Sequence, residues 1–327
     1  MKLVSYYDDG PRIGVVQDDH VWDLRRTYAH FLFETEHLVD SQAIAKRLVP
    51  RDMALFIRVN HRRISEYADA LAALGGAGSA TVSALAKPLA QVRLLPPILS
   101  PEKVICCGNS YVRHMREIEY RTKWPQDVKL SFLKPPSALI AHGETIYFPP
   151  DSEQWDYETE LAIVIGKPCS DISESEAHDH IFGYSILNDA CIRDMPEWTG
   201  RYDSPRGKAV DTFAPFGPWI VPAAFLGGNP DDLPLRTFVD GEERQSDRTS
   251  GLLWSVARFV AFVSRYIRLS PGDVISTGST AGNALHSGKF LKVGQKVRCE
   301  IDGIGVLENT VGKRAWHGHL PEIPPRP

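Results

Sequence analysis

The chain has 327 residues, of which 43% are hydrophobic and 24% charged, and its formal net charge is −4. This balance is typical of a globular protein with an apolar core, and it excludes a coiled coil, a collagen and a disordered tail. A slightly acidic chain has no basic footprint for nucleic acid or for an anionic membrane, so we expect neither partner. The 25 glycines and 24 prolines favour many turns, and therefore strand-rich structure.

The cysteines and the N-terminus bear on the compartment. Cys106, Cys107, Cys169, Cys191 and Cys299 are scattered and odd in number, which does not fit a disulfide framework. The N-terminus has no continuous apolar run of the kind found in secretory signals, and no stretch has about 18 uncharged apolar residues. We therefore expect a cytoplasmic protein with reduced cysteines and no membrane span.

The first third of the chain changes from strand patterns to helix patterns. Residues 1–24 alternate between apolar and polar positions around turns at 8–11 and 18–19, which predicts a β-meander. Apolar residues at mixed spacing predict helical structure over 38–75. A proline-rich stretch at 94–101 begins a new composition, so we divide the chain into a small α+β domain, 1–98, and a larger domain, 99–327.

The larger domain consists mostly of short strand patterns. Apolar or alternating runs predict strands at 103–107, 157–165, 183–187, 219–221, 235–239 and 297–301. A capping box at Ser173–Glu176 begins one helix, and apolar residues on one face predict another over 252–267. Few helices between strands argue for an all-β or β-rich roll rather than a doubly wound sheet. Glycine motifs of the Rossmann and P-loop types are missing from the sequence.

Two glutamates at the start of a strand pattern are the first candidate site. Glu158 and Glu160 are two residues apart, so their side chains share one face of the predicted strand. Like carboxylates near a core are costly unless a cation lies between them, and carboxylate oxygens suit Mg²⁺, Mn²⁺ or Ca²⁺. Asp189, after the run 183–187, is the natural third ligand. The spacing is equally compatible with a solvated strand end that carries two unrelated glutamates.

A histidine, a glutamate and a lysine form weaker candidates. His114 and Glu117 are neighbours on a helical turn, which is an arrangement used for general bases, although charged surface helices show the same spacing. Lys208 lies in a polar loop beside glycine, where it could neutralise a substrate carboxylate or a developing enolate. A surface lysine is the simpler reading of that position.

These candidates fall within ordered motifs. The motifs are, in chain order, 108–117, 134–138, 156–161, Gly183-Tyr184 with Asn188-Asp189 and Arg193-Asp194, 208–219, 271–278, and Gly303-Ile304-Gly305 with Asn309. Together they resemble the fumarylacetoacetate hydrolase family over about two thirds of the chain. The resemblance implies an α+β, β-rich fold, in which 99–327 is a mixed β-roll catalytic domain, and it implies a homodimer.

The resemblance also implies a role for each candidate. Glu158, Glu160 and Asp189 would hold a divalent metal, commonly Mg²⁺, with Mn²⁺ or Ca²⁺ as alternatives. His114 and Glu117 would form a catalytic dyad on a segment that closes over the substrate. Lys208, as a further catalytic residue, and Arg193 would face the substrate oxygens. Thr277 and Gly278 would bind near the substrate carboxylate.

Four positions depart from the family pattern. They are Ser110 in place of asparagine, Ser279-Thr280 in a turn that usually contains proline, Gln295 in place of aspartate, and Pro196 where a substrate-contacting glutamine is common. Family substrates are 2-oxo or β-diketo acids, so we expect a metal-dependent hydrolase that cleaves a C–C bond of an acylpyruvate. A decarboxylase, a hydratase or dehydratase, an isomerase or a tautomerase would use the same metal and enolate chemistry. A non-catalytic metal-binding protein and a ligand-binding regulator are the alternatives outside enzymology.

Overall fold

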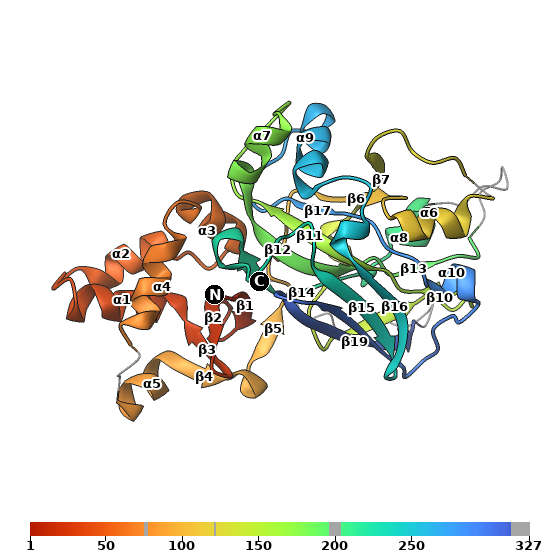
Figure 1. Cartoon of the computed structure of the whole chain (residues 1–327). Coiled ribbons are helices and arrows are strands. Elements are labelled where there is room, and N and C mark those ends of the chain that lie inside the picture. Colours follow the sequence, from red (N-terminus) through yellow and green to blue (C-terminus); the bar gives the residue numbers. More distant parts are fainter. Residues whose placement is uncertain (75–77, 121, 196–203, 315–327) are drawn as a thin grey trace.

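A computed structural model describes residues 1–74, 78–120, 122–195 and 204–314. These residues form a mixed α+β fold in which strands dominate (Figure 1). Within the described ranges, no helix combines the length and the apolar character that a bilayer crossing requires.

The main sheet has twelve strands, ten of them in the order β4-β3-β2-β1-β14-β12-β11-β17-β6-β7, while β5 pairs with β1 and β8 with β14. Its members are β1 (Leu3–Tyr7), β2 (Pro11–Gln17), β3 (His20–Asp23), β4 (Ala86–Pro88), β5 (Arg93–Leu95), β6 (Val104–Gly108), β7 (Lys129–Lys134), β8 (Leu139–Ile140), β11 (Thr159–Ile165), β12 (Ile181–Asn188), β14 (Ala214–Pro222) and β17 (Val274–Ser276). Strand β11 is buried along its whole length, as its unbroken apolar run predicts.

A second, five-stranded sheet has the order β16-β15-β18-β19-β9. It consists of β9 (Thr145–Phe148), β15 (Pro234–Val239), β16 (Glu242–Arg248), β18 (Lys296–Ile301) and β19 (Gly305–Lys313). A small pair, β10 (Trp155–Asp156) with β13 (Cys191–Ile192), lies next to the start of β11. Apolar side chains of β11, β12, β15, β18 and β19 share one core cluster, so the two sheets pack on each other beside this pair.

The helices lie in separate groups around the sheets (Figure 1). Near the N-terminus are α1 (Leu24–Glu34), α2 (Ser41–Leu48), α3 (Met53–Asn60), α4 (Ile64–Ala72) and α5 (Ser79–Leu85). The others are α6 (Val112–Ile118), α7 (Glu174–Ala177), α8 (Ser204–Lys208), α9 (Val256–Tyr266) and α10 (Ala284–Ser287). Helices α6 and α8 lie on the side of the molecule away from α1–α5.

The N-terminal region and the rest of the chain share a sheet and a core. Leu3 of β1 pairs with Ile220 of β14. Phe56 and Ile98 belong to the same buried cluster as Val104 on β6 and other side chains of the main sheet. The division into domains at residue 98 remains a prediction, and the structure adds that the main sheet runs across that division.

Most expected elements are found, with shifted ends. The meander forms β1–β3, and each of the six expected strands lies within or overlaps a strand of the structure. The helix expected over 252–267 begins only at Val256, because the Ser255 side chain accepts a hydrogen bond from the Arg258 N–H and caps it there. The capping box at Ser173 and Glu176 is present. Glu158 precedes its strand, which begins at Thr159, so only Glu160 lies within β11.

Candidate active site

Strand pairing brings the three expected metal ligands together. Strands β11 and β12 are antiparallel, with Thr159 opposite Asn188, so the residues just outside the two paired ends face each other. The Asp189 N–H donates to the Glu158 carbonyl over 2.9 Å. Glu158, Glu160 and Asp189 are buried, and one carboxylate oxygen of each lies within 4.8 Å of the others.

The strand neighbouring β11 and the turn that follows it hold Glu160. Its Oε2 accepts hydrogen bonds from Ser276 Oγ at 2.5 Å and from the Gly278 N–H at 2.9 Å. Gly278 has a φ of +92°, and a Cβ at this position would lie 2.9 Å from Ser110 Oγ, so the turn requires glycine. Burial raises the pKa of Glu160 well above its usual range, and the nearby Asp189 and Glu158 charges add to this effect.

Lys208 lies against the other two carboxylates. Its Nζ donates to Glu158 Oε2 and, over 2.6 Å, to Asp189 Oδ2. Burial alone would lower the pKa of Lys208, but the neighbouring negative charges, Asp189 foremost, raise it well above its usual value. Burial would likewise raise the pKa of Glu158, but the charges of Arg193 and Lys208 outweigh burial and hold that pKa well below its usual range.

A second buried lysine, Lys134 at the end of β7, adds a further positive charge beside the carboxylates. Its Nζ lies 2.7 Å from Asp189 Oδ1 and donates to the carbonyl oxygens of Lys208 at 2.5 Å and Phe213 at 2.9 Å. Lys134 is 2% exposed, and a buried ammonium is tolerated only with such partners. It ties the Asp189 side chain to the main chain at Lys208.

The donor set fits a hard divalent cation. Three buried carboxylates close together offer only oxygen ligands, which Mg²⁺, Mn²⁺ and Ca²⁺ prefer. The lysines neutralise part of the negative charge, and a divalent ion would add positive charge beside Glu160 and favour its ionised form. Glu158, Glu160 and Asp189 are therefore the residues that could hold the metal.

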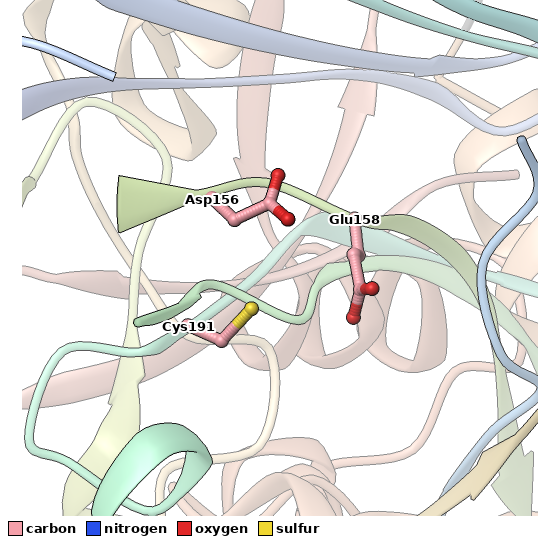
Figure 2. A group of neighbouring side chains, drawn as sticks. All are labelled: Asp156, Glu158 and Cys191. Carbon is pink, nitrogen blue, oxygen red and sulfur yellow. The ribbon is translucent and has the colours of Figure 1, made fainter. Parts of the chain in front are cut away.

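A second acidic group shares Glu158 but has a different character. Figure 2 shows Asp156, Glu158 and Cys191 converging from neighbouring segments of the chain. Arg193 spans the two carboxylates, with Nε 2.8 Å from Asp156 and a terminal nitrogen 2.5 Å from Glu158. Asp156 also accepts hydrogen bonds from the N–H groups of Ala284 and Leu285 at the start of α10. These oxygens already have partners, so we assign this group to holding Glu158 in place.

The expected dyad lies on α6, a helix of seven residues. His114 Nδ1 is 3.6 Å from Glu117 Oε2, which is within ion-pair range but longer than a hydrogen bond. Glu117 Oε1 accepts a hydrogen bond from the Gly282 N–H over 3.1 Å. The His114 charge is among the influences that lower the pKa of Glu158, so the helix and the carboxylate cluster are electrostatic neighbours.

Several polar atoms in this region are buried without a partner. Ser110 Oγ, Tyr111 OH, His114 Nδ1 and Thr277 Oγ1 form no hydrogen bond with any residue that the structure describes. Ser110 and Thr277 lie beside Gly278. Burial raises the pKa of Tyr111, and the nearby Asp247 and Glu160 charges add to this effect. Buried polar atoms are nearly always paired in folded proteins, so their gathering here marks a place that suits a polar ligand.

The structure thus brings together the nine side chains or backbone groups named from the sequence, but three of them, Lys208, Arg193 and Gly278, make contacts other than those expected. Lys208 donates to Glu158 and Asp189. The Gly278 N–H donates to Glu160, and the Arg193 bonds given above go to Asp156 and Glu158. Four further residues hold the site and were not singled out: Lys134, Asp156, Ser276 and Asn283, whose Nδ2 donates to Glu158 Oε1 over 3.3 Å. Lys134, Asp156 and Ser276 lie in motifs of the family resemblance, which was the available indication. Pro196 lies outside the described residues.

Comparison with known proteins identifies the family. The family model described as "Fumarylacetoacetate (FAA) hydrolase C-terminal" matches residues 103–312. The chain belongs to this family. The match contains every metal, dyad and lysine candidate, and the mixed, β-rich α+β architecture is that of solved family members.

Relatives within the family catalyse different reactions. The chain is 32% identical to the oxaloacetate tautomerase YisK of Bacillus subtilis over 296 residues, which is 88% of this chain and 97% of that protein. It is similar to the crystal structure of maleylpyruvate hydrolase from Sphingobium sp. SYK-6, with a TM-score of 0.69 and 29% identity over 96% of this chain and all of that one. The hydrolase from Exiguobacterium antarcticum gives a TM-score of 0.72 and 31% identity with the same coverage. Another structure of the Sphingobium enzyme is a complex with manganese(II) and pyruvate.

Proposed function

We propose that the chain is a divalent-metal-dependent enzyme that acts on a 2-oxo acid by way of its enolate. The observation that supports this proposal is the buried cluster of Glu158, Glu160 and Asp189, which Lys208 contacts directly and which lies beside the His114–Glu117 pair. A divalent ion held by the carboxylates would supply a Lewis acid for the oxygens of the 2-oxo acid. Mg²⁺ is our first choice, and Mn²⁺ is supported by the relative that binds it with pyruvate.

The side chains of the site have separate roles in this proposal. Lys208, a buried ammonium, stabilises the negative charge that develops on the substrate oxygen. His114 removes or returns a proton at the reacting carbon or at a water molecule, and Glu117 orients its ring and stabilises its protonated form. The hydroxyls of Thr277 and Ser110 at the Gly278 turn have no hydrogen-bond partner within the described ranges, and they would bind the substrate carboxylate.

Keto–enol tautomerisation of a 2-oxo dicarboxylic acid is the first candidate reaction. The long match to an oxaloacetate tautomerase supports it, because that match covers nearly the whole of both chains. Tautomerisation needs one proton moved between carbon and oxygen, which the His114–Glu117 pair can do without a water molecule.

Hydrolysis of an acylpyruvate, the first expectation from the sequence, is the second candidate reaction. Similarity to maleylpyruvate hydrolase over the full chain supports it. In that reaction His114 would take a proton from water, the hydroxide would add to the distal carbonyl, and the C–C bond would break. The carbon of the departing enolate would then take up a proton, to give pyruvate and a carboxylic acid.

A single panel of substrates separates the two reactions. Oxaloacetate, acetylpyruvate and maleylpyruvate are incubated with the enzyme and Mg²⁺ or Mn²⁺, while enol absorbance and NMR spectra are recorded. A tautomerase changes the rate of oxaloacetate enol–keto exchange and leaves total oxaloacetate constant. A hydrolase releases pyruvate and the matching acid in equal amounts.

Samples that contain the metal ion but no enzyme control for non-enzymatic reactions, and removal of the metal tests metal dependence. EDTA is expected to abolish either activity and added Mn²⁺ to restore it, and Glu160→Gln should show less than about 1% of wild-type activity because a charged carboxylate ligand is replaced by a neutral amide. Full activity in EDTA contradicts the proposal. The homodimer implied by the family resemblance is checked by sedimentation of the same samples.

A further inference from the structure

Gln245 has an unusual environment on β16. This strand, at the edge of the five-stranded sheet, is exposed or half-buried at its other six positions, whereas Gln245 is 1% exposed. A polar side chain at the one buried position of an edge strand gains little from burial itself. Its stabilisation must come from its hydrogen bonds.

Those hydrogen bonds saturate both ends of the amide. Gln245 Oε1 accepts from the Thr159 N–H at 3.1 Å and from Thr237 Oγ1 at 2.7 Å. Gln245 Nε2 donates to Ser279 Oγ at 2.9 Å and to the Thr280 carbonyl at 3.0 Å. The Thr159 N–H can only donate and the Thr280 carbonyl can only accept, so this arrangement fixes which end of the amide is oxygen.

The hydrogen-bond partners of both ends of the Gln245 amide lie next to residues of the carboxylate cluster. Thr159 lies between Glu158 and Glu160 in the sequence. Strand β17 pairs with β11 only at 162–164, so β17 does not pair with Thr159. The turn at Ser279 and Thr280 follows Gly278, whose N–H holds Glu160. One amide therefore links the backbone that carries two carboxylates to the turn that orients one of them, across the boundary between the two sheets.

The neighbours of Gln245 extend this connection to the dyad helix. Arg113 on α6 donates to the Ser246 carbonyl over 2.5 Å. Asp247 accepts a hydrogen bond from the Thr280 hydroxyl. Residues 245–247 of β16 thus contact the strand of the carboxylates, the turn after β17 and the helix that carries His114.

We infer that Gln245 is a positioning residue of the metal site: its amide holds the Glu158–Glu160 segment and the Gly278 turn in the arrangement that binds the ion. The inference rests on the proposed function, because it assumes that the carboxylates bind a divalent cation. Residues that orient metal ligands through hydrogen bonds typically change metal affinity or activity by about 10- to 100-fold when they are replaced.

The test measures Mn²⁺ affinity of the full-length protein by electron paramagnetic resonance, together with thermal unfolding. Gln245→Met keeps the size of the side chain and removes the hydrogen bonds of its amide, and we expect Mn²⁺ to bind about 10- to 100-fold more weakly. The matched control is Asn60→Leu, in α3. Asn60 is a buried amide that bonds to Leu48, Phe56 and Tyr67, far from α6 and α8 (Figure 1). We expect this control to lower the melting temperature and to leave Mn²⁺ affinity unchanged.

A milder variant keeps the inference testable if Gln245→Met does not fold. Thr237→Val is nearly isosteric and removes one of the two hydrogen bonds to Gln245 Oε1, so we expect a smaller loss of Mn²⁺ affinity. Wild-type affinity in both folded variants, or an equal loss in Asn60→Leu, overturns the inference. If the wild-type protein itself does not bind Mn²⁺, the proposed function fails first, and that result is visible before any variant is compared.

Discussion

At the scale of single residues, the division of labour between His114 and the carboxylates can be tested. Imidazole is a softer ligand than carboxylate, and the cluster of three carboxylates does not include His114. We expect His114→Gln to keep Mn²⁺ affinity and to lose turnover by about 10²- to 10⁴-fold, the usual effect of a lost general base. Steady-state kinetics and Mn²⁺ titration of the same sample provide both measurements.

Glu117 provides the matched variant for this prediction. If His114 and Glu117 act as a unit, Glu117→Gln should lose turnover in the same way, and the double variant should be little worse than the worse single one. Loss of Mn²⁺ binding in His114→Gln would make the histidine a metal ligand. Unchanged turnover would place the base elsewhere.

Lys208 contacts two of the carboxylates that would hold the ion. In Lys208→Met these carboxylates lose a buried cation, so without metal the protein should unfold at lower temperature. Mn²⁺ should bind at least as tightly as in the wild type and should raise the melting temperature by a larger amount. Turnover should fall by about 10²- to 10³-fold, because a group that stabilises developing charge is lost. Weaker Mn²⁺ binding would show that Lys208 supports the metal site instead.

At the scale of elements, sequence reasoning succeeded where the pattern is local. Glu158, Glu160 and Asp189 could be connected because each adjoins a buried strand, and paired strands place their ends together. Gln245 and Asn283 could not be found in this way, because their contacts join β16 and α10 to segments more than 80 residues away in the chain. Such contacts depend on how the two sheets pack, and the spacing of apolar residues along one strand does not predict that packing.

Helix α6 is the element for which we expect a response to ligand. It has seven residues, only Met115 is buried, and isolated helices of this length are marginal in water. A bound 2-oxo acid would add contacts to Tyr111 and His114, whose buried atoms have no partner among the residues that the structure describes. Oxalate with Mn²⁺ should therefore slow amide hydrogen exchange over 112–118. The longer α9 serves as the internal control, and equal protection of α6 with and without oxalate would contradict the prediction.

At the scale of the whole molecule, the sequence separated residues 1–98 from the rest by composition, whereas the structure joins them through strand pairing and packing. Strand β1 pairs with β14, and one buried cluster contains side chains from both sides of the division. Composition along a chain reports where segments differ, but it does not report which apolar faces they share. A shared core predicts cooperative unfolding, whatever the boundary in sequence.

Phe56→Ala in α3 tests whether the core is shared. Phe56 is fully buried, packs against Tyr67 with ring centroids 5.3 Å apart, and belongs to the same cluster as Val104 and Val164 of the main sheet. Removal of a buried phenylalanine costs about 3–5 kcal/mol of unfolding free energy. Because the core is shared, we expect one calorimetric transition that moves as a whole to lower temperature. The Mn²⁺ affinity of the folded protein, measured at about 25 °C, should be unchanged.

Leu55→Ala is the matched control for this experiment. Leu55 is next to Phe56 on the same helix but is 45% exposed, so its replacement should change the unfolding free energy far less. Two resolved transitions, of which Phe56→Ala shifts only one, would show that residues 1–98 unfold independently. The strand pairing between β1 and β14 would then be too weak to couple the two regions, since a single residue pair, Leu3 with Ile220, joins those strands. A single shifted transition, in contrast, shows that the N-terminal helices unfold together with the sheet that carries the metal site.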